Sequence, residues 1–153
     1  MGAKSLTRPV SKLYDEDFVA WASETARLLR AGRFDKIDVG HLAEEVEDMA
    51  NRDRRELLSR LRVLILHLLK WQQQPEKRSR SWKSTIVAQR AELKDLLDPS
   101  PSLRQILPES VVRTYRDAIE RASIETGLPE DSFPGQCPFS PEQILDRNFL
   151  PDR

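Results

Sequence analysis

Apolar residues recur at helical spacing along most of the chain, and no segment shows the two-residue alternation that is typical of a half-buried strand. The first such pattern predicts a helix over residues 15–31. Asp15 is the expected N-cap, and Trp21 and Leu28 lie on its apolar side. Gly32 follows at a position where a helix commonly ends. Residues 1–13 carry no periodic pattern, so we expect a flexible N-terminal arm there.

A second pattern predicts a long helix over about residues 39–73, with Asp38 as its cap. Its apolar stripe runs from Leu42, Val46, Met49 and Ala50 to Trp71. The second half is apolar nearly all round, which is typical of a central, covered helix. We therefore expect the first helix to pack antiparallel on the first half of this long helix, and two later helices to cover the second half.

Pro75 cannot continue that helix, and a third helix is predicted over about residues 82–97, capped by Ser79 or Ser81. A fourth pattern ends at Gly127. Near the C-terminus, "SPEQ" has the form of a capping box with proline at the first helical position, which predicts a short helix. The sequence thus predicts an all-α fold: a single-domain helical bundle over residues 14–153, with about four main helices around the long second helix and a short C-terminal helix.

Length and composition agree with this fold class. The 153 residues correspond to about one domain, and 33% of them are charged, which suits helices with much solvated surface. The formal net charge is zero, so no overall field would recruit nucleic acid or an anionic membrane. The single cysteine, Cys137, excludes an intramolecular disulfide and is expected to be a packed side chain. No signal-peptide pattern or membrane-spanning apolar run is visible, so we expect a cytoplasmic protein that does not enter a membrane.

Charge is unevenly distributed along the chain. Residues 14–48 contain ten acidic and four basic residues, whereas residues 70–94 contain seven basic and two acidic ones. The two groups could neutralise each other across packed helices or between subunits. Alternatively, the basic segment 77–94 is a nucleic-acid footprint in which Trp71 or Trp82 stacks on a base. The phosphate-binding candidates are then Arg78, Arg80, Lys83, Arg90 and Lys94.

Two groups of residues are candidates for chemistry. His67 lies at the edge of the long helix's stripe, where a buried core histidine is expected; the alternative is acid–base catalysis with Glu44, Glu45 or Arg90 as a partner. His41, Glu45 and Asp48 share one helical face and form a candidate metal site. Carboxylates near a helix start are expected from the helix dipole alone. Without an enzyme motif of known spacing, neither a metal nor another cofactor is expected.

The order of segments from "YDEDFVAWASETARLLRAGRFDKID" through "HLAEEVEDM", "LRVLILHLLKWQ" and "RSRSWKSTIVAQR" to "TGLPEDSFPGQCPFSPEQILD" closely resembles the bacterial domain-of-unknown-function family 29. The likeness covers about residues 14–152. It implies an all-helical single domain with no established activity, so it transfers no functional residue. The positions that carry it are Trp21, Glu44, Glu45, His67, Leu68, Lys70, Trp82 and Arg90.

These observations favour a non-enzymatic helical module that binds another macromolecule, with a protein partner or a homo-oligomer favoured over nucleic acid. A nucleic-acid-binding protein that uses residues 77–94 is the first alternative. The second is a hydrolase or metal-dependent enzyme built around His67 and Glu45.

Overall fold

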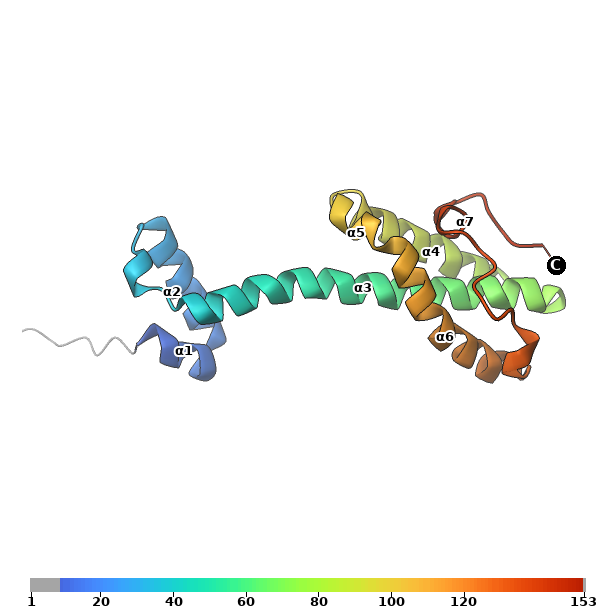
Figure 1. Cartoon of the computed structure of the whole chain (residues 1–153), viewed down its shortest axis with the longest axis horizontal. Coiled ribbons are helices and arrows are strands. Elements are labelled where there is room, and N and C mark those ends of the chain that lie inside the picture. The colour runs from blue at the N-terminus through green and yellow to red at the C-terminus, as the bar shows by residue number, and fades with distance from the viewer. Residues whose placement is uncertain (1–8, 153) are drawn as a thin grey trace, which may run out of the picture. The chain divides into compact units, whose positions relative to one another are not determined.

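The computed structural model describes residues 9–152, which form seven α-helices and three short 3-10 helices (Figure 1). No strand occurs among these residues, which confirms the all-α fold. The helices are α1 (Val10–Glu16), α2 (Phe18–Arg30), α3 (Val39–Gln73), α4 (Arg80–Leu97), α5 (Pro101–Gln105), α6 (Leu107–Thr126) and α7 (Pro141–Leu145). The 3-10 helices are η1 (Phe34–Lys36), η2 (Pro75–Lys77) and η3 (Glu130–Ser132). The bounds of α3 coincide with the predicted long helix.

The chain divides into two compact units, of which the first ends at Asn51 and the second begins at Arg52. Helix α3 contributes residues to both. A single domain over residues 14–153 therefore stays a prediction. Residues 1–8 of the expected N-terminal arm lie outside the described residues. Residues 10–13 form the beginning of α1, so helical structure starts before Tyr14, where the sequence pattern placed its onset.

In the first unit, the helix expected over residues 15–31 is two helices separated at Asp17. Asp17 has an extended backbone, with φ −151°, and its Oδ1 accepts a hydrogen bond from the amide of Ala20 at 3.0 Å. This side chain, rather than that of Asp15, caps the second helix. Gly32 follows α2 with φ +68°, as the sequence predicted.

An aromatic cluster connects α1 and α2 to the beginning of α3. The ring of Tyr14 stacks on His41 with centroids 3.8 Å apart and meets the edge of Trp21 at 5.0 Å. Further along α3, Val46, Met49 and Ala50 are exposed. The prediction that the first helix covers this half of the long helix is therefore wrong at these three positions.

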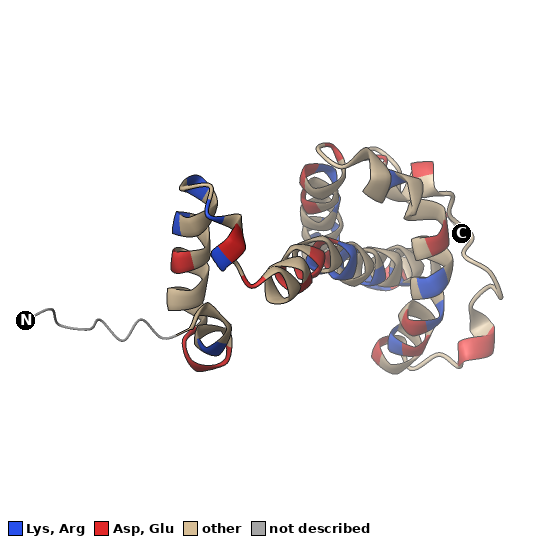
Figure 2. Cartoon of the chain, turned by 60° about the vertical axis from the view of Figure 1, so that its left-hand side comes forward, with Lys and Arg blue, Asp and Glu red and all other residues tan. Residues whose placement is uncertain are grey.

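The second unit contains the main hydrophobic core, at the second half of α3. Leu57, Leu61, Leu64, Ile65, Leu66, Leu68 and Leu69 of this helix are fully buried. They form one cluster with apolar residues of α4, α5, α6 and α7, which confirms that later helices cover this half (Figure 1). In Figure 2, acidic and basic positions alternate along the same helices, so charges of both signs lie close together within the unit.

The predicted helix ends of this unit follow from local hydrogen bonds. The Ser79 hydroxyl accepts a hydrogen bond from the amide of Trp82 at 3.1 Å, so α4 begins at Arg80, two residues earlier than expected. Gly127 ends α6 with φ +75°. The capping box at the start of α7 is present, with reciprocal bonds between Ser140 and Gln143.

Candidate functional site

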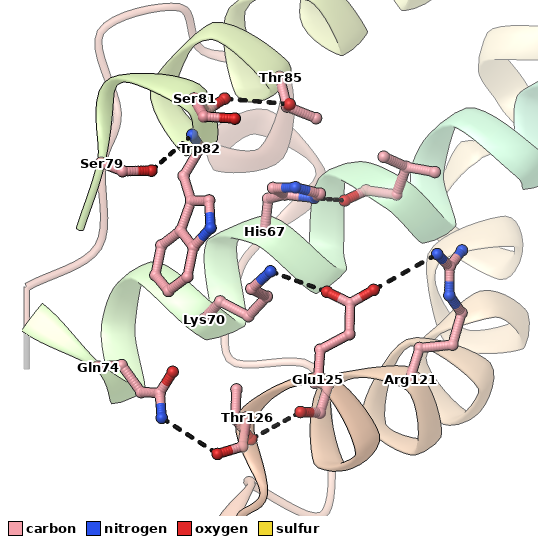
Figure 3. Close-up of polar contacts among 12 residues, drawn as sticks. His67, Lys70, Gln74, Ser79, Ser81, Trp82, Thr85, Arg121, Glu125 and Thr126 are labelled. Carbon is pink, nitrogen blue, oxygen red and sulfur yellow. Dashed lines mark hydrogen bonds and ion pairs between the residues drawn. The ribbon is translucent and has the colours of Figure 1, made fainter. Parts of the chain in front are cut away.

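A polar cluster built around the buried Lys70 lies where α3, α4 and α6 meet (Figure 3). Lys70 is only 8% exposed, and its ammonium nitrogen lies 2.8 Å from a carboxylate oxygen of Glu125 on α6. The same nitrogen lies 4.5 Å from the centre of the Trp82 ring on α4, a cation–π distance. The hydrogen bond from Lys70 lowers the pKa of Glu125. Lys70 thus joins three helices through one charged group.

His67 lies one turn before Lys70 and is half-buried. Its Nδ1 lies 2.8 Å from the carbonyl oxygen of Val63. Because a carbonyl only accepts hydrogen bonds, Nδ1 must carry the proton. Burial lowers the pKa of His67, and the positive charge of Lys70 lowers it further. The imidazole is therefore neutral at pH 7 and held by its own helix, as expected of a structural histidine.

The hydrogen bond of His67 goes to Val63 of its own helix and not to a partner named in the catalytic alternative. Among the described residues, no hydrogen bond or ion pair joins His67 to Glu44, Glu45 or Arg90. Glu45 instead accepts a hydrogen bond of 2.6 Å from the hydroxyl of Tyr14, and this bond raises the pKa of Tyr14 to about 12. Glu44 is exposed.

Two further side chains of the segment that follows α3 support the fold. Gln74 donates to the carbonyl of Thr126 at 3.3 Å, which satisfies an acceptor at the end of α6. Arg78 donates to the carbonyls of Trp71 at 2.8 Å and Pro151 at 3.3 Å, and its guanidinium lies 5.1 Å from the Trp71 ring. Arg78 thereby connects the end of α3 to the C-terminal segment.

The five basic candidates for phosphate contacts occupy three kinds of environment. Arg78 and Arg90 both donate to main-chain carbonyls, and Arg90 is only 6% exposed. Lys94 is exposed and forms an ion pair with Asp98. Arg80 and Lys83 are exposed, without an ion pair among the described residues. The structure therefore divides the basic segment into architectural and solvated residues.

The three candidate metal ligands make different contacts. The His41 Nδ1 lies 2.5 Å from Asp38, the cap of α3, and this carboxylate raises the pKa of His41. Glu45 bonds to Tyr14, and Asp48 is exposed. Among residues 9–152, no group of three or more histidine, cysteine, aspartate or glutamate side chains is arranged to hold a metal ion.

Cys137 is half-buried, and its thiol lies 3.5 Å from the carbonyl of Phe139. Burial raises the pKa of this thiol, which makes it a poor nucleophile at neutral pH. Tyr115 packs in the same region and donates to the carbonyl of Pro134 at 2.5 Å.

Sequence reasoning missed the ion-pair partners of the candidate residues. Glu125 was not singled out, although it pairs with Lys70. Asp38 was expected only as a helix cap, and it also pairs with His41. A capping aspartate three residues before a histidine is a signal that could have indicated the second pair. Glu125 is 55 residues from Lys70, and no local pattern indicates it.

The fold and the cluster define an all-helical protein in which the most buried charges connect helices. The chain matches the family model described as Domain of unknown function DUF29 over residues 13–150, and it belongs to that family. No curated protein and no solved structure matches it. Within the described residues, no helix combines the length and the apolar character needed to cross a membrane.

Proposed function

We propose that this protein is a non-enzymatic helical module that binds another protein through apolar side chains exposed on the first unit. The observation that carries this proposal is their distribution. Ten large apolar side chains are exposed among the described residues, and seven of them lie between residues 18 and 49. These seven are Phe18, Val19, Leu29, Phe34, Val39, Val46 and Met49.

Three of these side chains form what we call the α3 stripe: Val39, Val46 and Met49, which are 67%, 57% and 62% exposed. Spacings of seven and three residues place them along one face of the helix. Fully burying one such side chain contributes about 1.5–3 kcal/mol, so a partner that covers the stripe would gain substantial binding free energy. Exposed carboxylates of Glu44, Glu47 and Asp48 lie on the same turns, which favours a partner with an apolar face and a basic rim.

The small core of the first unit also supports a partner. Within this unit, the buried side chains of the described residues are those of Trp21, Thr25 and Leu28. Segments of about 40 residues seldom bury enough apolar surface to be stable alone. A bound protein would extend this core, as exposed apolar surfaces commonly do at protein–protein interfaces.

The alternatives have less support. A hydrolase needs His67 and Glu45 in one site, and the hydrogen bonds of these residues go to Val63 and Tyr14. Nucleic-acid binding through the basic segment depends mainly on Arg80 and Lys83, because Arg78 and Arg90 donate to main-chain carbonyls and Lys94 pairs with Asp98.

We expect the protein to act in the cytoplasm.

Site-specific photo-crosslinking in the cells that produce the protein tests this function. A benzophenone amino acid replaces Val46 in one variant and Val112 in a control; Val112 is 75% exposed on α6, in the second unit. We expect a discrete protein adduct from position 46 and none from position 112. The adduct's mass spectrum identifies the partner, including a second copy of this chain. Absence of an adduct at position 46, or the same adducts from both positions, would contradict the proposal.

A further inference from the structure

A pocket with a volume of about 600 Å³ lies among α4, α5 and the segment around α7, entirely within the second unit. This volume is within the range of about 300–1,000 Å³ that is usual for small-molecule sites. Part of its lining is apolar: Val87, Ala91, Leu97 and Leu145. The protein-binding surface proposed above belongs to the first unit, so the inference drawn from this pocket does not depend on it.

Four basic side chains line the same pocket: Arg90, Lys94, Arg104 and Arg147. The acidic side chain in the lining is Asp98, whose carboxylate pairs with Lys94 and also lies 3.0 Å from Arg104. One carboxylate therefore serves two cations, and the lining keeps a net charge of +3. Arg147 is exposed and has no ion pair among the described residues. Apolar walls strengthen such a field because they exclude water.

Arg90 gives the pocket a fixed positive charge. Its side chain is held by two hydrogen bonds to main-chain carbonyls of α7, from Nε to Ile144 at 2.8 Å and from Nη2 to Gln143 at 3.2 Å. Both acceptors are neutral, so they orient the guanidinium without cancelling its charge. A guanidinium has five N–H donors, and the remaining ones have no protein acceptor among the described residues. Asp146 is the nearby carboxylate whose charge acts on Arg90, and it does not line the pocket.

We infer that this pocket binds a small organic anion that has a carboxylate or phosphate group and an apolar body. The anionic group would pair with Arg104, Arg147 and the fixed Arg90, since guanidinium groups match both oxyanions geometrically. The apolar body would lie against Val87, Ala91 and Leu145. Charge alone would favour any anion, whereas the apolar lining selects those that carry a hydrophobic group.

Four probes separate these contributions in titrations followed by calorimetry and by amide shifts of the full-length protein. They are 1-naphthoate, 1-naphthyl phosphate, neutral 1-naphthol and inorganic phosphate. We expect at least one naphthyl anion to bind about tenfold or more tightly than both naphthol and inorganic phosphate. The preferred naphthyl anion identifies the anionic group. Amide shifts should concentrate at Ala91, Arg147 and Asn148.

Two double variants complete the test. Arg104→Gln with Arg147→Gln should weaken the naphthyl anion about tenfold or more, because two charge-assisted contacts are lost. Arg113→Gln with Arg116→Gln removes the same charge from exposed positions of α6 and should leave binding unchanged. A third variant, Ala91→Phe, fills the pocket without changing its charge. It should abolish binding of the naphthyl anion. The inference is overturned if no naphthyl anion binds, if naphthol binds equally well, or if both double variants weaken binding alike.

Discussion

The ammonium nitrogen of Lys70 lies 2.8 Å from a carboxylate oxygen of Glu125, although 55 residues separate them in the chain. Lys70 is buried, whereas the Glu125 side chain is 35% exposed. The two members of the pair therefore differ in what their removal leaves behind. Without Glu125, a buried ammonium group loses its carboxylate partner; without Lys70, the carboxylate retains access to water.

We predict that Glu125→Gln lowers the free energy of unfolding by about 1–3 kcal/mol, because it leaves the Lys70 charge poorly compensated. Lys70→Met should cost less than about 1 kcal/mol, since it replaces the charge with an apolar side chain of similar size. Urea denaturation of the two variants measures both effects. A larger loss for Lys70→Met than for Glu125→Gln would show that Lys70 stabilises the fold mainly through contacts other than its ion pair with Glu125.

The two histidines should titrate on opposite sides of the usual histidine pKa of about 6.5. The carboxylate of Asp38 raises the pKa of His41, whereas burial lowers that of His67. The chain contains two histidines, so their imidazole proton signals are easily assigned by NMR with a His41→Gln variant. Titration of both rings at the same pH would contradict the environments described for them.

These shifts also predict how stability depends on pH. The folded protein takes up a proton at His67 less readily than the unfolded chain, so the contribution of His67 is present above about pH 6.5 and is lost as the pH falls below it. The contribution of His41 has the opposite sign: it is present below about pH 6.5 and is lost as the pH rises through the raised pKa. Replacing His67 by Leu should keep the fold and reduce the loss of stability as the pH falls below about 6.5. An unchanged pH profile in this variant would argue against a buried, neutral His67.

Arg90 should be required for the stability of α7. Arg90→Met removes two hydrogen bonds from a charged donor, and the carbonyls of Gln143 and Ile144 then lose the guanidinium that donates to them. We expect a loss of about 2–4 kcal/mol and faster amide hydrogen exchange at Ile144. Arg113→Met, at an exposed position of α6, is the control and should change stability by less than about 0.5 kcal/mol. Equal effects of the two substitutions would contradict an architectural role for Arg90.

The nucleic-acid alternative makes a separate prediction. If the basic segment binds phosphates, affinity for single-stranded DNA should fall steeply with salt. Replacing both Arg80 and Lys83 by Ala should then weaken binding about equally for all sequences. Filter binding at low salt measures this, with Arg113→Ala and Arg116→Ala as a charge-matched control. Absence of binding by the unmodified protein would exclude this alternative.

Local features of the sequence predicted the ends of several helices well. The bounds of α3 follow from the Asp38 cap and the nearby Pro75, and the capping box of α7 is encoded within four residues. The first helix was predicted wrongly because Asp15 and Asp17 are both good caps, and the local pattern does not decide between them. In the structure, Asp17 has an extended backbone and its side chain caps α2.

Tertiary contacts were harder to predict from the sequence. The apolar residues of α3 keep one helical phase from Leu42 to Trp71. Most of those in the second half of the helix are buried, whereas Val46 and Met49 are exposed. Periodicity identifies an apolar face without indicating whether the chain itself covers that face. Similarly, Arg90 was a candidate for phosphate contacts only in the nucleic-acid alternative. No local pattern indicates its acceptors, which are carbonyls 53 and 54 residues further along the chain.

The central claim is that the exposed α3 stripe binds a protein, and one matched comparison tests it most directly. Val46→Lys and Val112→Lys make the same change at exposed helical positions, so each should alter the free energy of unfolding by less than about 0.5 kcal/mol. The tagged proteins are recovered from the cells that produce them and their companions are quantified by mass spectrometry. We predict that a specific protein accompanies the unmodified chain and Val112→Lys, and that Val46→Lys loses most of it. A tenfold weaker affinity lowers the recovered amount by up to about nine-tenths when the partner is far from saturation. Equal recovery with Val46→Lys, while that variant remains folded, would contradict the account.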